Sequence, residues 1–216
     1  MNGNCMKIPK IFFILIAICS ITIISVSTVF AECRKEPGAQ CQGAKLGGID
    51  WRGAKLDGGN FKNADLEHAN FAGASLKGAI LRGANLQQAR LEQSDLSGAN
   101  LESADLRWAN LENAILFKAR FTNANMAKSD LENADLSQAI LTGADLTRAD
   151  LVSADLQQAE MQGVKLDGAY MAYANMKQAN LTGASINRTR FIGVRLKDAI
   201  WVDGKICTAP SIGICK

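Results

Sequence analysis

The sequence has little of what most enzymes use for chemistry. Among its 216 residues there is one histidine, His68, with no serine or cysteine beside it to form a nucleophilic pair. A glycine-rich phosphate-binding motif, a nucleophile elbow and a metal-binding helix motif are also absent from the sequence. These absences exclude the common catalytic motifs, so we expect no catalytic residue, no bound metal and no cofactor.

Proline and cysteine are confined to the two ends of the chain. No proline occurs between Pro37 and Pro210, and no cysteine occurs between Cys41 and Cys207. The long stretch without proline can therefore form a continuous ladder of backbone hydrogen bonds. The composition, with 48% hydrophobic and 21% charged residues, is that of a globular domain.

Residues 1–31 have the composition of an export signal. Two lysines precede an apolar run, and Val29-Phe30-Ala31 supplies small residues at the −3 and −1 positions of a cleavage site. We predict cleavage after Ala31 and a periplasmic or extracellular location. The alternative is an uncleaved membrane anchor at residues 11–30, because about 20 apolar residues can span a bilayer. Cleavage leaves 22 basic and 21 acidic side chains, and this near-neutral charge favours neither a polyanion nor a nucleic-acid-binding protein.

From residue 46 to residue 206, every fifth residue is apolar. These 33 positions hold 21 Leu, four Phe, four Met, two Trp and two Ile, and the residue two places earlier is Ala at 25 of them. Residues five apart are rotated by about 140° on a helix and point to opposite faces of a strand, so neither element explains the pattern. A chain that turns a corner every five residues does explain it, with the small and the large residue of each side pointing inward and the coils stacked as a β-solenoid.

The repeat A-D/N-L-x-x, as in Ala64-Asp65-Leu66 and Ala104-Asp105-Leu106, closely resembles that of the pentapeptide-repeat proteins over about residues 42–206. The resemblance implies an all-β fold, a right-handed quadrilateral parallel β-helix with four pentapeptides per coil. On that basis the 33 repeats make about eight coils and, at about 4.8 Å per coil, a rod roughly 40 Å long. The predicted segments are a signal peptide at 1–31, an N-terminal cap at 32–41, the solenoid at 42–206 and a disulfide-bearing tail at 207–216.

The position between the small and the large residue holds Asp nine times and Asn eight times. Short polar side chains of this kind hydrogen-bond to nearby backbone at turns. We therefore interpret them as turn formers and not as catalytic acids, even where two stack, as in Asp130 above Asp150 and Asp135 above Asp155. Gly recurs two places after the apolar residue at 12 positions, which is consistent with corners that need a permissive backbone.

Both ends of a solenoid expose a core and a strand edge, and both must be capped. Trp51 and Trp201 occupy inward positions near the first and last coils, where one large ring can plug the open square. The same ends carry four cysteines, Cys33, Cys41, Cys207 and Cys215. Of the three pairings, the roughly 40 Å rod implied by the family leaves only a bridge within each end, because disulfides need Cα atoms within about 7 Å. An oxidising compartment allows such disulfides to persist. The alternative is that the cysteines bind a metal, but the two cysteines at each end are too few for a four-ligand site.

Function must then lie on the outer surface, where two features stand out. Residues 129–160, the acidic belt, carry a net charge of −6 beside a basic end, residues 161–216, of net +5. Chance variation of Asp at one position of the repeat can also produce segments of like charge, so a functional role for the acidic belt stays open. Folding at twenty residues per coil also gathers an apolar patch of Val152, Tyr170, Ala172, Tyr173 and Ile192. Such patches often mark contact surfaces, although these residues are also good strand formers.

The sequence favours an exported, non-enzymatic structural or protein-interaction scaffold whose partner it does not name. The alternative is a carbohydrate- or cell-envelope-binding protein that uses exposed aromatic side chains such as Trp108, Tyr170 and Tyr173. Within the family, quinolone-resistance proteins look like B-form DNA and bind DNA gyrase as dimers; the near-neutral charge and the export signal leave this as a minor alternative. Open solenoid ends favour dimerisation whereas cysteine caps oppose end-on stacking, so monomer and dimer both stay open.

Overall fold

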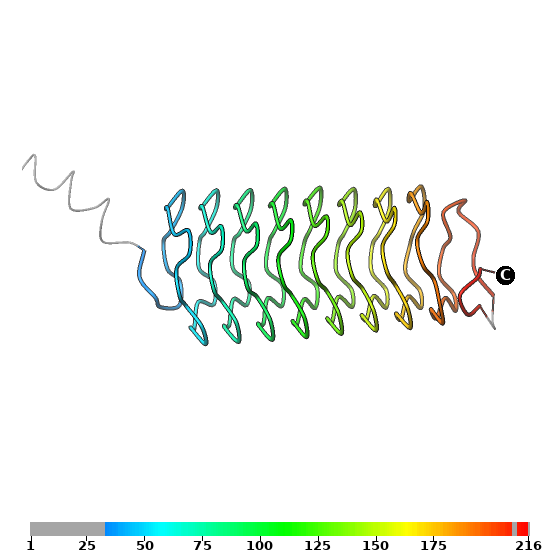
Figure 1. The fold of residues 1–216 in the computed structure, drawn as a ribbon, viewed down its shortest axis with the longest axis horizontal. Coiled ribbons are helices and arrows are strands. Elements are labelled where there is room, and N and C mark those ends of the chain that lie inside the picture. Colours follow the sequence, from blue (N-terminus) through cyan, green and yellow to red (C-terminus); the bar gives the residue numbers. More distant parts are fainter. Residues whose placement is uncertain (1–32, 209–210, 216) are drawn as a thin grey trace, which may run out of the picture.

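The computed structural model describes residues 33–208 and 211–215, which form a straight stack of coils along one axis (Figure 1). The predicted signal peptide, residues 1–31, lies outside the described residues. Within the described ranges there is neither a helix nor an extended strand, and the coils are joined by single-residue bridges. No helix in these ranges is long and apolar enough to cross a membrane.

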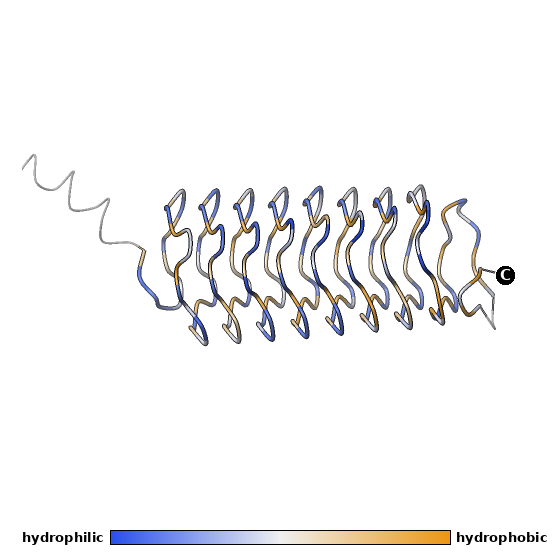
Figure 2. Ribbon diagram, in the orientation of Figure 1, coloured by the Kyte–Doolittle hydropathy of each residue, from blue (hydrophilic) through white to orange (hydrophobic). Residues whose placement is uncertain are grey.

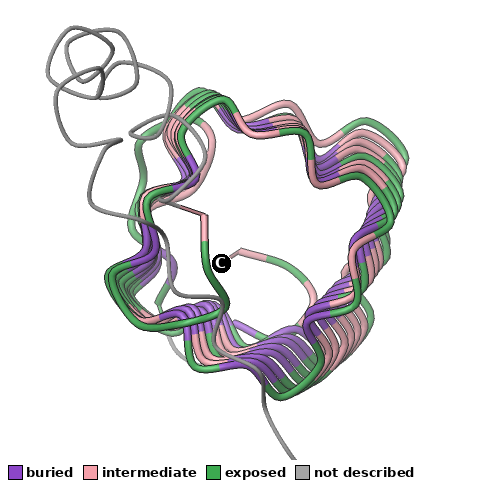
Figure 3. Cartoon of the chain, turned by 90° about the vertical axis from the view of Figure 1, so that its left-hand side faces the viewer, coloured by how far each residue is buried: buried purple, intermediate pink, exposed green. Residues whose placement is uncertain are grey.

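Every fifth residue forms a parallel bridge to the residue twenty places further along the chain. The first of these bridges joins Gln40 to Asn60, and the last joins Asn180 to Ile200. A twenty-residue register with a bridge at every fifth residue gives each coil four sides. The view along the rod shows the sides superimposed on one another, with exposed residues at the corners (Figure 3). The fold is a quadrilateral β-helix, as the resemblance to the pentapeptide-repeat proteins implies.

Most five-residue sides that carry Asp or Asn satisfy their backbone N–H groups in the same way. In one repeat, Leu86 and Gln88 donate to carbonyls of the next coil at 2.7 and 3.0 Å, and Asn85 donates to the previous coil at 2.9 Å. Ala84 donates three residues back, at 3.0 Å, to close the corner. The remaining N–H, of Gln87, donates to the side-chain Oδ1 of Asn85 at 3.2 Å. The Asp or Asn at this position thus accepts from the one N–H that the coil leaves unpaired, which confirms its predicted turn role.

The core is a stack of the inward large residues with the small residues between them. Hydrophobic and hydrophilic residues recur at the same places around successive coils (Figure 2). Most Leu, Phe and Met side chains of the repeat are fully buried. Trp51 is 7% exposed and packs edge-on against Phe61 and Phe71, each 6.1 Å away between ring centroids. Trp201 is only partly buried and lies 5.4 Å from the ring of Phe191.

The prediction that the solenoid continues inward to residue 206 is wrong. The last parallel bridge ends at Ile200, after which the chain reverses, and Ile206 pairs antiparallel with Ile200 and is 64% exposed. The cause is local: Gly204 occupies the small position and adopts a left-handed φ of 84°. A tight turn then closes by a 2.7 Å hydrogen bond from Trp201 N–H to the carbonyl of Lys205.

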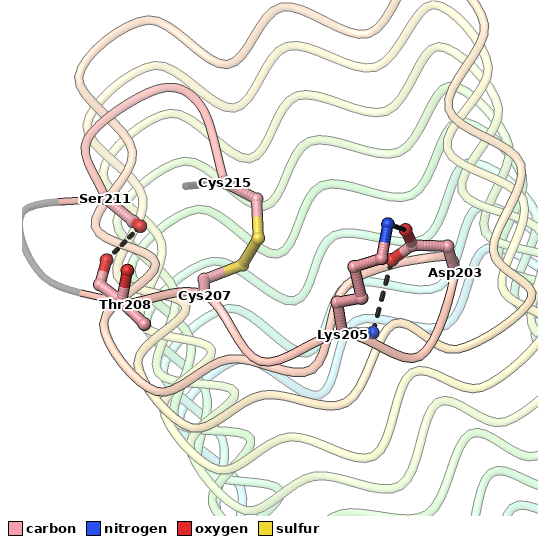
Figure 4. Close-up of a disulfide and its surroundings, with 6 residues drawn as sticks. All are labelled: Asp203, Lys205, Cys207, Thr208, Ser211 and Cys215. Carbon is pink, nitrogen blue, oxygen red and sulfur yellow. Dashed lines mark hydrogen bonds and ion pairs between the residues drawn. A yellow bond between two sulfur atoms is a disulfide. The ribbon is translucent and has the colours of Figure 1, made fainter.

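The reversed chain covers part of the C-terminal edge and is held by a disulfide (Figure 4). Cys207 and Cys215 are bonded with their Cα atoms 4.9 Å apart, and the N-terminal pair, Cys33 and Cys41, is bonded at 4.5 Å. Both pairings are those the sequence predicts. Leu196 N–H donates to a tail carbonyl at 2.9 Å, so the tail supplies hydrogen bonds that a further coil would otherwise provide.

Candidate interaction surface

The structure gathers no catalytic constellation from the acids and the histidine named above. His68 is exposed, and its Nε2 lies 3.6 Å from a carboxylate oxygen of Glu67. Asp130 and Asp135 each accept a backbone N–H two residues on, at 3.0 and 2.9 Å. The described ranges contain no group of three or more His, Cys, Asp or Glu residues that could hold a metal ion. The stacked carboxylates are therefore parts of the turns.

A shallow hollow of about 540 Å³ lies at one corner near the C-terminal end, between Arg148 and Arg188. Its acid, Asp167, accepts hydrogen bonds from the Ser185 hydroxyl at 2.7 Å and from the Asn187 N–H at 2.8 Å. The hydrogen bond from Ser185 is the main reason that the pKa of Asp167 lies below its ordinary value. An acid held ionised in this way ties neighbouring coils together and is poorly suited to proton transfer.

Outward side chains on either side of an inward residue lie side by side. Arg52 and Asp50 form an ion pair at 2.8 Å, and Arg107 and Asp105 form one at 2.7 Å. The hydrogen bond from Arg52 lowers the pKa of Asp50 to about 2. Within the acidic belt, Asp145 pairs with a lysine of the basic end at 3.6 Å. Local pairs of opposite charge thus occur at several places along the rod.

The apolar residues predicted to share a surface do lie together. Parallel bridges at Tyr170 hold three successive coils in register. The apolar residues on these coils, called here the tyrosine patch, are Val152, Tyr170, Ala172, Tyr173 and Ile192. The exposed fractions are 41% for Tyr170, 64% for Tyr173 and 62% for Ile192, while Val152 and Ala172 are half-buried. Large apolar side chains therefore stand in solvent on one side of the rod.

Two contacts that sequence reasoning missed hold the tyrosine rings in place. Tyr173 sits at a corner with a left-handed φ of 62°, and its ring lies against Gly193, where an added Cβ would be 2.7 Å from ring atom Cδ1. The guanidinium of Arg190 lies 4.6 Å from the centre of the Tyr170 ring. Both partners are twenty residues after the tyrosine that they contact, so the coil register could have identified them.

Trp108, also named from the sequence as an exposed aromatic residue, does not belong to the tyrosine patch. It is 56% exposed on another column of the rod. The ammonium of Lys128, again twenty residues on, lies 4.0 Å from the centre of its ring. One face of the indole is therefore covered by a cation.

Comparison with known proteins agrees with this architecture. A family model for pentapeptide repeats matches in eight copies over residues 38–73, 60–98, 79–117, 119–158, 129–168 and 159–198. No curated protein matches the chain. Among solved structures, the chain is similar to HetL, a pentapeptide repeat protein involved in heterocyst differentiation regulation from the cyanobacterium Nostoc sp. strain PCC 7120. The two are 29% identical, with 85% of this chain and 97% of HetL covered and a TM-score of 0.45.

It is also similar to QnrB1, a plasmid-mediated fluoroquinolone resistance protein, at 20% identity and a TM-score of 0.66, with 75% of this chain and 84% of QnrB1 covered. The likeness to QnrB1 is one of fold alone. The family match spans nearly all of the region that folds as a four-sided coil. The chain belongs to the pentapeptide-repeat family.

Proposed function

We propose that the chain is an exported, non-enzymatic scaffold that binds a partner through the tyrosine patch. The observation that carries this proposal is the grouping of Tyr170, Tyr173 and Ile192, each more than 40% exposed, on one side of the rod. Contiguous exposed apolar surface is costly in water unless a partner covers it.

Export to the periplasm or the extracellular space is part of the proposal. It is supported by the signal-like composition of residues 1–31 and by two disulfides, which persist in oxidising compartments. If the signal stays uncleaved, residues 11–30 anchor the same rod on the extracytoplasmic side. We expect a rod of about eight coils at about 4.8 Å per coil.

Each alternative function has an observation against it. Carbohydrate binding by stacking needs open aromatic faces, and Trp108 carries the Lys128 ammonium on one face. Gyrase binding by DNA mimicry needs dense negative charge, whereas the acidic belt of this chain lies beside a basic end. The likeness to QnrB1 is too distant in sequence to transfer its drug-resistance role.

The test is affinity capture of the exported protein from its native envelope. We expect the Tyr170→Ser, Tyr173→Ser double variant to lose the captured partner while it keeps the unfolding temperature of the parent chain. Trp108→Ser is the matched control, because it removes an exposed aromatic side chain elsewhere on the rod and should leave capture unchanged. Equal capture by the double variant and the parent would exclude the patch as the binding surface.

A further inference from the structure

The tyrosine patch is complementary to a second copy of itself that is turned end for end. Parallel bridges stack Asp150, Tyr170 and Arg190 in one column, in that order. The column beside it, in the same three coils, holds Val152, Ala172 and Ile192. If a second identical surface is turned end for end, Asp150 faces Arg190, the two Tyr170 rings face each other, and Val152 faces Ile192. Such self-complementarity is what a two-fold symmetric interface requires.

The two charged residues of this arrangement are available for contacts with another molecule. Asp150 uses Oδ1 to accept the N–H of Val152 at 3.0 Å, and no ion pair of Asp150 or Arg190 occurs among residues 33–208 and 211–215. Some acids and arginines elsewhere on the rod do pair within the chain, as Arg107 does with Asp105 at 2.7 Å. In the patch, Arg190 instead lies over the Tyr170 ring, which separates it from Asp150.

We propose that the tyrosine patch binds a second copy of this chain, with the two rods side by side and antiparallel. This inference rests on the proposed role of the patch as a partner-binding surface. The two-fold axis crosses the rods at the Tyr170 row, lies in the contact plane and is perpendicular to both rods. Such a rotation keeps each column opposite itself and reverses the order of the coils. It therefore forms two Asp150–Arg190 ion pairs and buries Val152 against Ile192 twice.

The size of the overlap sets the expected affinity. About five coils at about 4.8 Å, with a face about 20 Å wide, give an overlap of roughly 500 Å² per copy, below the roughly 800 Å² of a standard stable interface. At the preceding corner Arg148 faces Arg188 of the second copy, which weakens the contact further. We expect a reversible dimer with a Kd on the order of 10 μM.

A charge swap tests the proposal. Association is measured by sedimentation equilibrium of the purified full chain, in the form that its host produces. Asp150→Arg and Arg190→Asp should each weaken association at least about tenfold, because each places like charges opposite one another. The double variant, with both charges exchanged, should return to within about threefold of the parent. The repeat tolerates both changes, since the same column already holds an arginine at Arg90 and an aspartate at Asp130. Asp50→Arg, in the same column but outside the overlap, is the control and should leave association unchanged.

A mass that stays monomeric up to about 500 μM, or a double variant no better than either single one, overturns the dimer. These outcomes are separable from failure of the proposed function. A monomeric chain whose captured partner is lost in the double tyrosine variant disproves self-association and leaves the scaffold proposal standing. If the charge swap restores the dimer while the tyrosine substitutions leave capture from the envelope unchanged, self-association stands and the patch binds no other partner.

Discussion

Removal of the C-terminal disulfide should open one end of the rod and leave the rest folded. The perturbation is the pair Cys207→Ala and Cys215→Ala, with alanine chosen because Cys207 is fully buried and a serine hydroxyl there would need a partner. The tail it releases accepts the N–H groups of Leu196 and Asp198, each at 2.9 Å. These amides are the nearest reporters of the cap.

The magnitude follows from the loop that the disulfide closes. Cys207 and Cys215 are separated by eight residues. For a loop of that length the lost chain entropy corresponds to about 2.5 kcal/mol at 25 °C. A change of that size raises the opening constant of the tail roughly 60-fold. Because each coil of a solenoid contacts only its neighbours, the effect should fade within about two coils.

Native-state hydrogen exchange measured by mass spectrometry is the assay. Peptides that contain Leu196 and Asp198 should lose protection in the variant, while peptides from the middle coils should not change. The pair Cys33→Ala and Cys41→Ala is the matched control, since it should loosen the opposite end only. Unchanged exchange at Leu196 and Asp198, or a uniform rise along the whole rod, would refute the reasoning.

Three other substitutions test the turns, the core and the pH response. Gly193→Ala should destabilise the chain more than Gly163→Ala in urea unfolding. Both glycines have a positive φ, at which a side chain costs about 1–2 kcal/mol. Only a Cβ added at Gly193 would contact a tyrosine ring, so equal losses of stability in the two variants would contradict that contact. Leu101→Ala, at a fully buried site, should cost about 3 kcal/mol by the same assay, and a loss below about 1 kcal/mol would mean that the coils collapse around the gap. The Ser185 hydroxyl lowers the pKa of Asp167 below its ordinary 3.8. The ionised Asp167 therefore contributes fully to folding stability above pH 3.8, and this contribution is lost as the pH falls through the lower pKa of the folded state. Asp167→Asn should thus unfold with a weaker pH dependence below pH about 4, and an identical profile would contradict the assignment.

Much of the fold was predictable because the repeat is local. The five-residue period places Leu86 inward, leaves Gln87 outward and puts a polar acceptor, Asn85, where the corner needs one, and the structure confirms each of these positions. The end of the solenoid was not predictable in the same way. Ile206 keeps the apolar period and yet is exposed, because Gly204 permits a reversal that the period alone does not reveal.

The candidate surface was predictable in its membership but not in its contacts. Folding at twenty residues per coil grouped the five residues of the tyrosine patch correctly. The same register held the positions of Gly193 and Arg190, but the ring-to-glycine contact and the stacking on Tyr170 depend on side-chain rotamers. A periodic pattern does not encode rotamers.

The sequence by itself determined the inward and outward residues, the turn-forming role of Asp and Asn, and the placement of the cysteines at the two ends. These features follow from steps of five residues, in which neighbours along the chain decide the geometry. Only the tertiary structure decided the contacts between residues twenty apart, the reversal after Ile200 and, within the described ranges, the lack of an ion pair at Asp150 and Arg190. Those features depend on which side chains meet when one coil stacks on the next, and a five-residue period does not set how many sides make a coil.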